Sequence, residues 1–147
     1  ARAEMDVNYF GFLRLAQELA PALRARAADG QSSACAWVNL LSVFALANQP
    51  AHGTFSASKA AAYSLAQCLR AEMRPAGVRV INVFPGPIDD EWNQQVLPPK
   101  VAPNTLATAI VRALRDGVED VFPGDVAQEW LARWRDNPKA LEREIGG

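Results

Sequence analysis

The sequence predicts an α/β protein with a parallel β-sheet. Two short and almost continuously apolar segments, residues 34–41 and 78–84, are typical of strands that are buried on both faces. A longer segment with apolar residues at helical spacing precedes each of them. Helices and strands that alternate in this way along a chain indicate a parallel sheet.

The first half of the chain is expected to begin with a long helix over residues 6–27. Apolar residues recur there at helical spacing, and Pro21 should kink or loosen the helix. Residues 28–33 have the composition of a loop. The first strand, residues 34–41, follows directly.

The middle of the chain predicts a second helix and a second strand. Residues 42–53 are irregular, and an alanine-rich helix then spans residues 54–74 with Thr54 as its N-cap. The second strand, residues 78–84, is rich in β-branched side chains. Pro-Gly-Pro at 85–87 ends it.

The last third of the chain predicts a loop over residues 89–102 and then smaller elements. The first is a helix over 105–115 with Asn104 as its cap and Gly117 at its end, and a minimal strand at 121–122 follows it. The next helix starts with a capping box of Asp125 and Gln128, and a final helix starts at Asn137-Pro138. We expect Trp130 and Trp134 of the penultimate helix to be core or interface anchors.

Composition and charge exclude several classes of protein. The 147 residues are 50% hydrophobic, and 15 Lys and Arg nearly balance 16 Asp and Glu. This balance lacks the basic surface that binding to nucleic acid or to an anionic membrane needs. No apolar run approaches the ~20 residues of a membrane span. Two cysteines and one histidine are too few for a disulfide framework or a structural metal site. We therefore expect a cytoplasmic protein with no nucleic-acid, membrane or metal partner.

The chemistry-bearing residues gather around the two strands. No glycine-rich phosphate loop occurs, and a serine hydrolase would have to pair Ser42 with the only histidine, His52, without the usual G-x-S-x-G turn. Ser42 stands at the carboxyl end of the first strand, where open α/β sheets bind their ligands. Lys59 lies near the start of the alanine-rich helix, and Pro85-Gly86 follows the second strand.

In order and spacing, these residues resemble the short-chain dehydrogenase/reductase family. The matching segments are Val-Asn-Tyr-Phe-Gly at 7–11, Val-Asn-Leu-Leu-Ser at 38–42, Phe-Ser-Ala-Ser-Lys-Ala at 55–60 and Arg-Val-Ile-Asn-Val-Phe-Pro-Gly at 79–86. The resemblance implies a partial Rossmann-like, doubly wound parallel sheet. Residues 1–147 would form a single unit, the C-terminal substrate-binding and catalytic part of such a domain.

The resemblance also implies a role for each matching residue. Ser42 would hydrogen-bond the substrate oxygen, Lys59 would hold the nicotinamide ribose and lower the pKa of a neighbouring phenol, and Asn8 would anchor a water in the proton relay. Taken singly, these residues could equally be a turn serine, a solvated lysine and a surface asparagine. The remaining expected site residues are, on the nicotinamide side, Pro85, Gly86 and Ile88, and, in the substrate pocket, Phe44 and Trp92.

The sequence departs from the family at the catalytic residue itself. The family has a tyrosine at position 55, where this chain has Phe55, so the group that gives or takes the substrate proton is absent. General acid–base catalysis typically contributes ~10²–10⁴-fold. Tyr63 lies about 12 Å further along the helix by its rise and is a poor substitute. Asp90 stands near the place of a threonine that often contacts the nicotinamide.

The resemblance further implies a half of the fold that this sequence does not contain. The strand, glycine-rich turn and helix that bind the cofactor pyrophosphate would precede Ala1, so we expect a missing N-terminal half or a partner chain to supply them. The implied function is that of an NAD- or NADP-dependent oxidoreductase acting on a small-molecule alcohol/carbonyl pair, impaired by Phe55. A non-catalytic binding or assembly subunit is the alternative, and a stand-alone interaction domain is a third possibility.

Oligomerisation is also expected from the resemblance. Family members commonly associate through the helices that correspond to residues 6–27 and 54–74. Small side chains, Ala61, Ala62 and Ala66, would allow close helix approach, and we expect a homodimer or tetramer.

Overall fold

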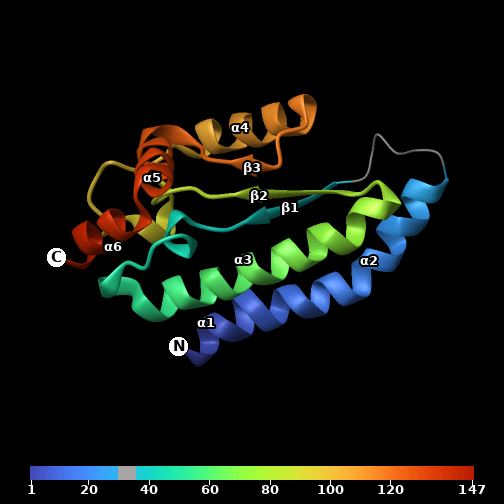
Figure 1. Ribbon diagram of the computed structural model, residues 1–147, viewed down its shortest axis with the longest axis horizontal. Coiled ribbons are helices and arrows are strands. Elements are labelled where there is room, and N and C mark those ends of the chain that lie inside the picture. The colour runs from blue at the N-terminus through green and yellow to red at the C-terminus, as the bar shows by residue number, and fades with distance from the viewer. Residues whose placement is uncertain (30–35) are drawn as a thin grey trace.

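A three-stranded parallel sheet lies between two layers of helices in the computed structural model, which describes residues 1–29 and 36–147. The strands are β1 (Ala36–Leu40), β2 (Arg79–Val83) and β3 (Asp120–Val121), in the order β1-β2-β3. Figure 1 shows α2 (Phe12–Ala28) and α3 (Gly53–Met73) side by side on one face and α4 (Pro103–Asp116) on the other. Helices α5 (Gly124–Asp136) and α6 (Pro138–Gly146) lie near the carboxyl ends of β1 and β2. The predicted doubly wound α/β fold is confirmed.

The first helix starts earlier than predicted and contains an unexpected segment. The chain is helical from Arg2, in α1 (Arg2–Met5), and passes through a π-helical segment, η1 (Asp6–Gly11), into α2. A Cβ atom at Gly11 would lie 3.2 Å from the backbone oxygen of Asp6, so the absent side chain leaves room for the wider turn. The α-helix continues through Pro21. Single π-helical turns inside α-helices occur frequently at functional sites.

Three of the predicted helix caps are wrong. Helix α3 starts at Gly53, which places Thr54 inside the first turn, and α4 starts at Pro103, which places Asn104 there as well. Neither helix has a side-chain cap, and proline suits the first turn of α4 because its missing N–H would be unpaired there in any case. Asp125 and Gln128 form no capping box, because α5 begins at Gly124.

Two other helix ends are as predicted. Gly117 ends α4 with a φ of 72°, in the left-handed region that favours glycine. Asn137 precedes α6, and its side-chain oxygen accepts a hydrogen bond from the backbone N–H of Ala140 at 3.1 Å. Pro138 occupies the first helical position, where proline is tolerated.

The central strand β2 carries the core on both faces. Met73 of α3 and Trp37 of β1 pack with Val80 on one face, while Leu106 of α4 packs with Ile81 and Val83 on the other. These three β2 side chains are at most 1% exposed. The prediction of a strand buried on both faces is confirmed for β2.

The same prediction is wrong for β1. Trp37 and Asn39 are buried under α2 and α3, but Val38 is 38% exposed and Leu40 is 48% exposed on the opposite face. Helix α4 covers β2 and β3 and leaves this part of the sheet uncovered (Figure 1). Strand β1 is also an edge strand, because β2 is its only neighbour in the sheet that the structure describes.

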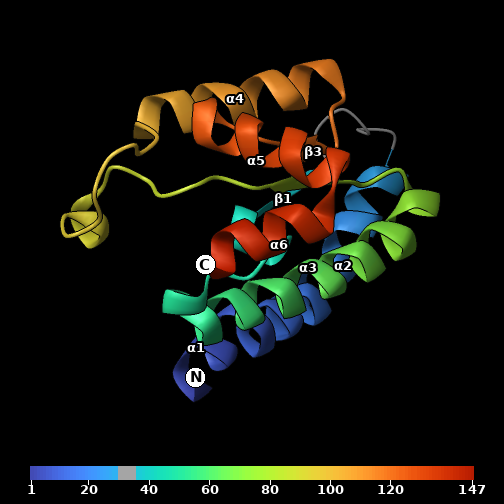
Figure 2. The same ribbon diagram turned by 60° about the vertical axis from the view of Figure 1, so that its left-hand side comes forward.

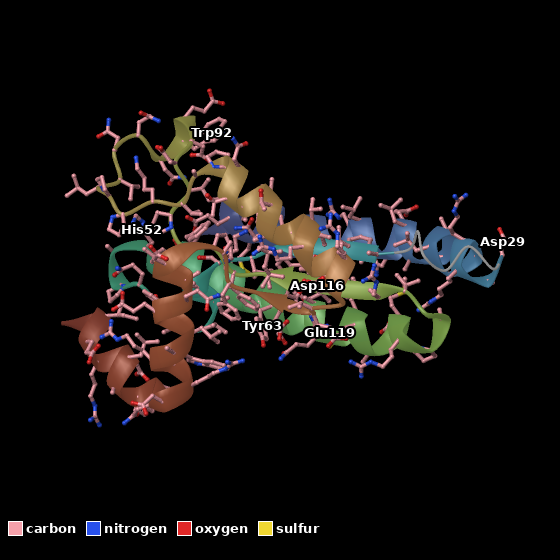
Figure 3. All side chains as sticks on the ribbon, turned by 90° about the horizontal axis from the view of Figure 1, so that it is seen from above. Asp29, His52, Tyr63, Trp92, Asp116 and Glu119 are labelled. Atoms are coloured by element: carbon pink, nitrogen blue, oxygen red, sulfur yellow. The ribbon has the colours of Figure 1, made fainter. Side chains whose placement is uncertain are left out.

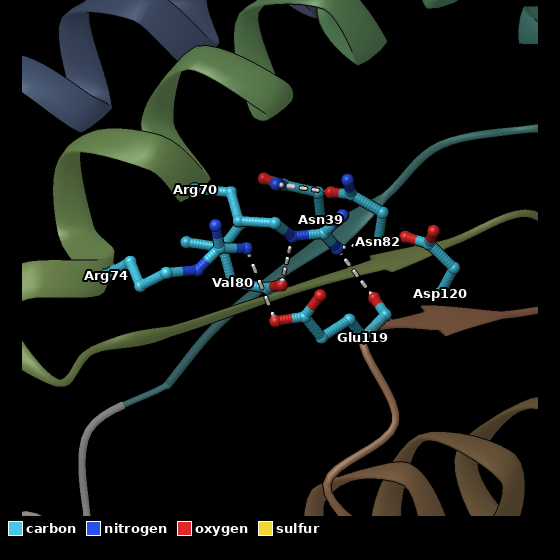
Figure 4. A network of polar contacts seen from close by, with 7 residues as sticks. All are labelled: Asn39, Arg70, Arg74, Val80, Asn82, Glu119 and Asp120. Carbon is cyan, nitrogen blue, oxygen red and sulfur yellow. Dashed lines mark hydrogen bonds and ion pairs between the residues drawn. The ribbon is translucent and has the colours of Figure 1, made fainter.

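Polar side chains tie the strands to each other and to α3 (Figure 4). The amide of Asn39 donates to the side-chain oxygen of Asn82 at 2.9 Å, across the register of β1 and β2. Arg70 of α3 donates to the backbone oxygen of Val80 at 3.0 Å and to Asp120 of β3 at 2.9 Å. The helix layer and all three strands are therefore fixed relative to one another by directed hydrogen bonds.

Two further findings concern contact between copies of the chain and the spanning of a membrane. Ala62 and Ala66 are buried inside the chain, at 3% and 0% exposure, so they cannot bring two copies of α3 together as predicted. Their small size instead lets α3 pack closely on its own sheet. None of the helices in the described residues is both long and apolar enough to span a membrane.

Candidate active site

The loops that follow β1 and β2 meet at the carboxyl edge of the sheet. Because the strands are parallel, both chains leave the sheet at this edge. The backbone N–H of Leu41 donates to Val83 at 2.8 Å, and that of Val43 donates to Pro85 at 3.1 Å. The pairing thus extends beyond the strands and brings the residues after β1 beside those after β2.

A cleft of about 460 Å³ lies at this edge. All of the site residues predicted from the sequence line it, except Asn8 and Trp92. They are Ser42, Phe44, Phe55, Lys59, Pro85, Gly86 and Ile88. The cleft walls are mostly apolar, so they suit a ligand with an apolar body.

Ser42 is buried and lines the cleft. It follows β1 in an extended conformation and caps the short 3₁₀ turn η3 (Val43–Ala45), its hydroxyl oxygen accepting from the backbone N–H of Phe44 at 3.1 Å. No acceptor for the hydroxyl hydrogen of Ser42 occurs among the described residues. Ser42 can therefore donate this hydrogen to an oxygen atom of a ligand.

Phe55 and Lys59 stand one turn apart on α3. The Lys59 ammonium group lies 5.7 Å from the centre of the Phe55 ring and donates to the backbone oxygen of Leu40 at 3.0 Å. Burial of the ammonium group lowers the pKa of Lys59. Lys59 also lines a neighbouring groove of about 530 Å³ between α2 and β1, so it stands where the two hollows meet.

Asn8 belongs to the groove and not to the cleft. It lies in the π-helical segment η1, and its amide donates to the hydroxyl oxygen of Ser58 at 2.9 Å. Ser58 in turn donates to the backbone oxygen of Phe55 at 2.7 Å. Sequence reasoning missed Ser58, which is fully buried and links η1 to the first turns of α3. Its only signal was a serine within an alanine-rich helix, where the hydroxyl needs a partner.

Trp92 does not line the cleft in this structure. Its side chain is 85% exposed on a loop that projects from the body of the molecule (Figure 2). Asn93 and Val96 of the same loop do line the cleft. The carboxylate of Asp90 accepts from the backbone N–H groups of Trp92 and Asn93, at 3.1 Å each, and so caps the turn that carries Trp92.

His52 is a further lining residue that sequence reasoning considered only for a hydrolase. It precedes the first turn of α3, and its ring is stacked on that of Phe44 at 6.4 Å. Figure 3 places His52 at the same end of the molecule as Trp92 and far from Asp29. Trp130 contacts Phe44 from α5, with ring centres 5.6 Å apart, which confirms it as a core anchor. The side chain of Trp134 is half-buried.

The arrangement provides a hydrogen-bond donor, a cation and an aromatic ring around one apolar cleft. Ser42 can hold an oxygen atom, and Lys59 can bind hydroxyl groups through its remaining N–H donors. Phe55 contributes a ring face but no ionisable group. Together with the sheet, this defines a doubly wound α/β protein with a ligand cleft at the carboxyl edge of its strands.

Comparison with known proteins identifies the family. The family model for short chain dehydrogenases matches residues 1–100, so the chain belongs to the short-chain dehydrogenase family. A crystal structure of a short chain dehydrogenase from Burkholderia cenocepacia, in complex with NADP, is 40% identical with a TM-score of 0.89. The match covers 98% of this chain and 58% of that one.

Curated relatives match over a shorter segment. The short-chain dehydrogenase PC-15 of Penicillium crustosum is 38% identical over 87 residues, which is 59% of this chain and 30% of that protein. YbbO, an uncharacterized oxidoreductase of Escherichia coli, is 32% identical over 100 residues, which is 65% of this chain and 35% of that protein. The matched segment thus spans about a third of the length of these relatives.

Proposed function

We propose that this chain is the substrate-binding part of an NAD- or NADP-dependent oxidoreductase that acts on an alcohol/carbonyl pair. The observation that carries the proposal is the convergence of Ser42, Phe55 and Lys59 on one cleft at the carboxyl edge of the sheet. Phe55 makes this an impaired catalyst, because no side chain at that position can exchange a proton with the substrate oxygen.

The residues present fit the nicotinamide end of such a cofactor. One N–H of the Lys59 ammonium group is used on Leu40, which leaves two donors for ribose hydroxyls. Pro85, Gly86 and Ile88 provide a wall for the nicotinamide. A Cβ atom at Gly86 would lie 2.9 Å from Val126 of α5, so glycine is what lets this wall and α5 approach each other. When bound, the cofactor would supply or accept the hydride.

Within the cleft, each residue would have a separate task. Ser42 donates a hydrogen bond to the substrate oxygen and polarises the carbonyl group. Lys59 orients the cofactor ribose. The apolar side chains, among them Phe44 and Ile88, exclude water from the reacting atoms. Trp92 would reach the substrate when its loop folds over the cleft.

We propose that the open side of β1 receives the part of the fold that binds the cofactor pyrophosphate. The sequence of this chain has no glycine-rich turn for a pyrophosphate. Val38 and Leu40 leave an apolar surface exposed there, and the adjoining groove runs along α2 to Lys59. A further segment or chain that adds a parallel strand to β1 would cover this surface and complete the cofactor site beside Lys59.

A non-catalytic binding or assembly subunit is the competing function, and Phe55 is the observation that favours it. Such a subunit would keep the cleft and lose the proton transfer.

Both functions are compatible with a cytoplasmic location, which we propose because free nicotinamide cofactors are held inside the cell. A homodimer or tetramer is also part of the proposal, with exposed Phe10 as a contact that does not depend on the buried alanines of α3.

A chimera tests the proposed function. This chain would be joined to the segment of the Burkholderia cenocepacia dehydrogenase that lies outside the matched 58%. With Phe55→Tyr, we expect turnover of aldehydes or ketones with NADPH or NADH, and a rate ~10²–10⁴-fold lower with Phe55 retained. Ser42→Ala in the Phe55→Tyr chimera should lower the rate again. A Phe55→Tyr chimera that folds and binds cofactor but stays at background turnover would favour the non-catalytic subunit.

A further inference from the structure

Lys59 is held in the cleft without a counter-charge. Among the described residues, no carboxylate lies within ion-pair distance of its ammonium group, whose contacts are the backbone oxygen of Leu40 and the ring of Phe55. The other two lysines of the chain differ in this respect. Lys100 lies 3.4 Å from Asp89, and Lys139 lies 2.8 Å from Glu142.

The surroundings of Lys59 make its ammonium group easier to deprotonate than that of Lys139. Apolar side chains of Leu41 and Phe55 line the cleft beside it, and among the described residues His52 is the only other titratable side chain that lines the cleft or the groove. Burial lowers the pKa of Lys59, whereas the hydrogen bond that Lys139 donates to the carboxylate of Glu142 raises the pKa of Lys139. A neutral lysine amine is a nucleophile, and an ammonium group is not.

We propose that Lys59 is a nucleophile that condenses with apolar aldehydes and ketones in the cleft to form an imine. The lone pair of Nζ forms a bond to the carbonyl carbon. The carbonyl oxygen then leaves as water together with the two hydrogens of the neutral amine, and a C=N bond replaces the C=O bond. No electrons are gained or lost, and no other reactant is consumed.

Ser42 would assist this addition. Its hydroxyl hydrogen, which has no acceptor among the described residues, can be donated to the carbonyl oxygen as negative charge develops there. Because position 55 is a phenylalanine, no phenolate lies beside the amine to hold it in the charged form. This activity goes beyond the proposed oxidoreductase function and needs no nicotinamide, so either proposal can fail while the other holds.

Reductive trapping on the 147-residue chain tests the proposal. The chain is incubated at neutral pH with 3-phenylpropanal and sodium cyanoborohydride, and peptide mass spectrometry then quantifies the alkylated amine at each of the three lysines. We expect roughly tenfold faster labelling at Lys59 than at Lys100 or Lys139. In concentrated guanidinium chloride the three rates should become similar. Labelling governed by accessibility alone would instead favour Lys139, whose side chain is 75% exposed, and would overturn the proposal.

Matched variants test whether the amine of Lys59 is the group that reacts. Lys59→Arg keeps a long side chain with N–H donors but has no nucleophilic amine, so it should abolish the fast adduct, while Lys139→Arg should leave labelling at Lys59 unchanged. Ser42→Ala should slow adduct formation several-fold with the fold retained, as judged by circular dichroism. An equal yield of fast adduct in folded Lys59→Arg would show that another amine reacts, and the proposal would be wrong.

Discussion

Strands β1 and β2 have similar sequences but different surroundings. Both are short apolar segments with an asparagine at the paired positions Asn39 and Asn82. Strand β2 is buried on both faces, whereas β1 alternates between buried and exposed residues. The difference shows that an apolar sequence makes a strand suitable for burial on both faces. Whether each face is buried depends on which helices and strands lie beside it.

The largest expected effect comes from truncating the covered strand. Ile81→Ala removes a side chain that is 1% exposed between β2 and α4, and it should lower the free energy of unfolding by about 2–5 kcal/mol. Val38→Ala, on the open face of β1, should cost less than about 1 kcal/mol because water already reaches this side chain. Urea denaturation followed by circular dichroism measures both. Equal losses would contradict the described difference between the strands.

The next effect concerns the link between α3 and the sheet. Arg70 is 14% exposed and donates to Val80, Glu119 and Asp120. Arg70→Met keeps much of the side-chain volume but leaves these acceptors without their donor, so we expect a loss of about 1–3 kcal/mol. Arg74→Met is the matched control, because its ion pair with Glu119 spans 3.8 Å at the exposed surface and should contribute little. Thermal unfolding of the two variants measures the difference.

A smaller effect is expected in the pH dependence of stability. Because burial lowers the pKa of Lys59, the folded chain binds fewer protons than the unfolded chain between the lowered value and the usual value of about 10.4. Stability contributed by Lys59 therefore rises with pH across this window. The difference in unfolding free energy between wild type and Lys59→Met should shift in favour of wild type as the pH is raised above neutral. A difference that does not change with pH would contradict the burial of the charge.

The sequence was sufficient for the parallel fold and for most of the candidate site. Ser42 and Pro85 follow the two parallel strands, whose carboxyl ends lie side by side, and Lys59 reaches the same cleft from the second turn of α3. The caps were harder to predict. Asn137 caps its helix, whereas Thr54 does not, because α3 begins at Gly53 and Thr54 lies inside its first turn.

Long-range contacts account for what sequence reasoning missed. Ser58 matters because η1, fifty positions earlier in the chain, brings Asn8 to its hydroxyl group. His52 joins the cleft because its ring is stacked on Phe44 from a separate loop. Neither approach has a local signature in the sequence. The exposure of Val38 is likewise a property of what surrounds β1.

Amide hydrogen exchange tests most directly whether the open side of β1 is a docking edge for another strand. Leu41 donates its N–H to β2, and since N–H groups alternate in direction along a parallel strand, the N–H of Val38 points to the open edge. In the isolated chain, the N–H of Val38 should exchange fast. The N–H of Ile81, which points from β2 toward β1, should exchange slowly. In the chimera with the Burkholderia cenocepacia segment, we predict that exchange at Val38 slows to the range of Ile81. Unchanged fast exchange at Val38 in a folded chimera would contradict the account.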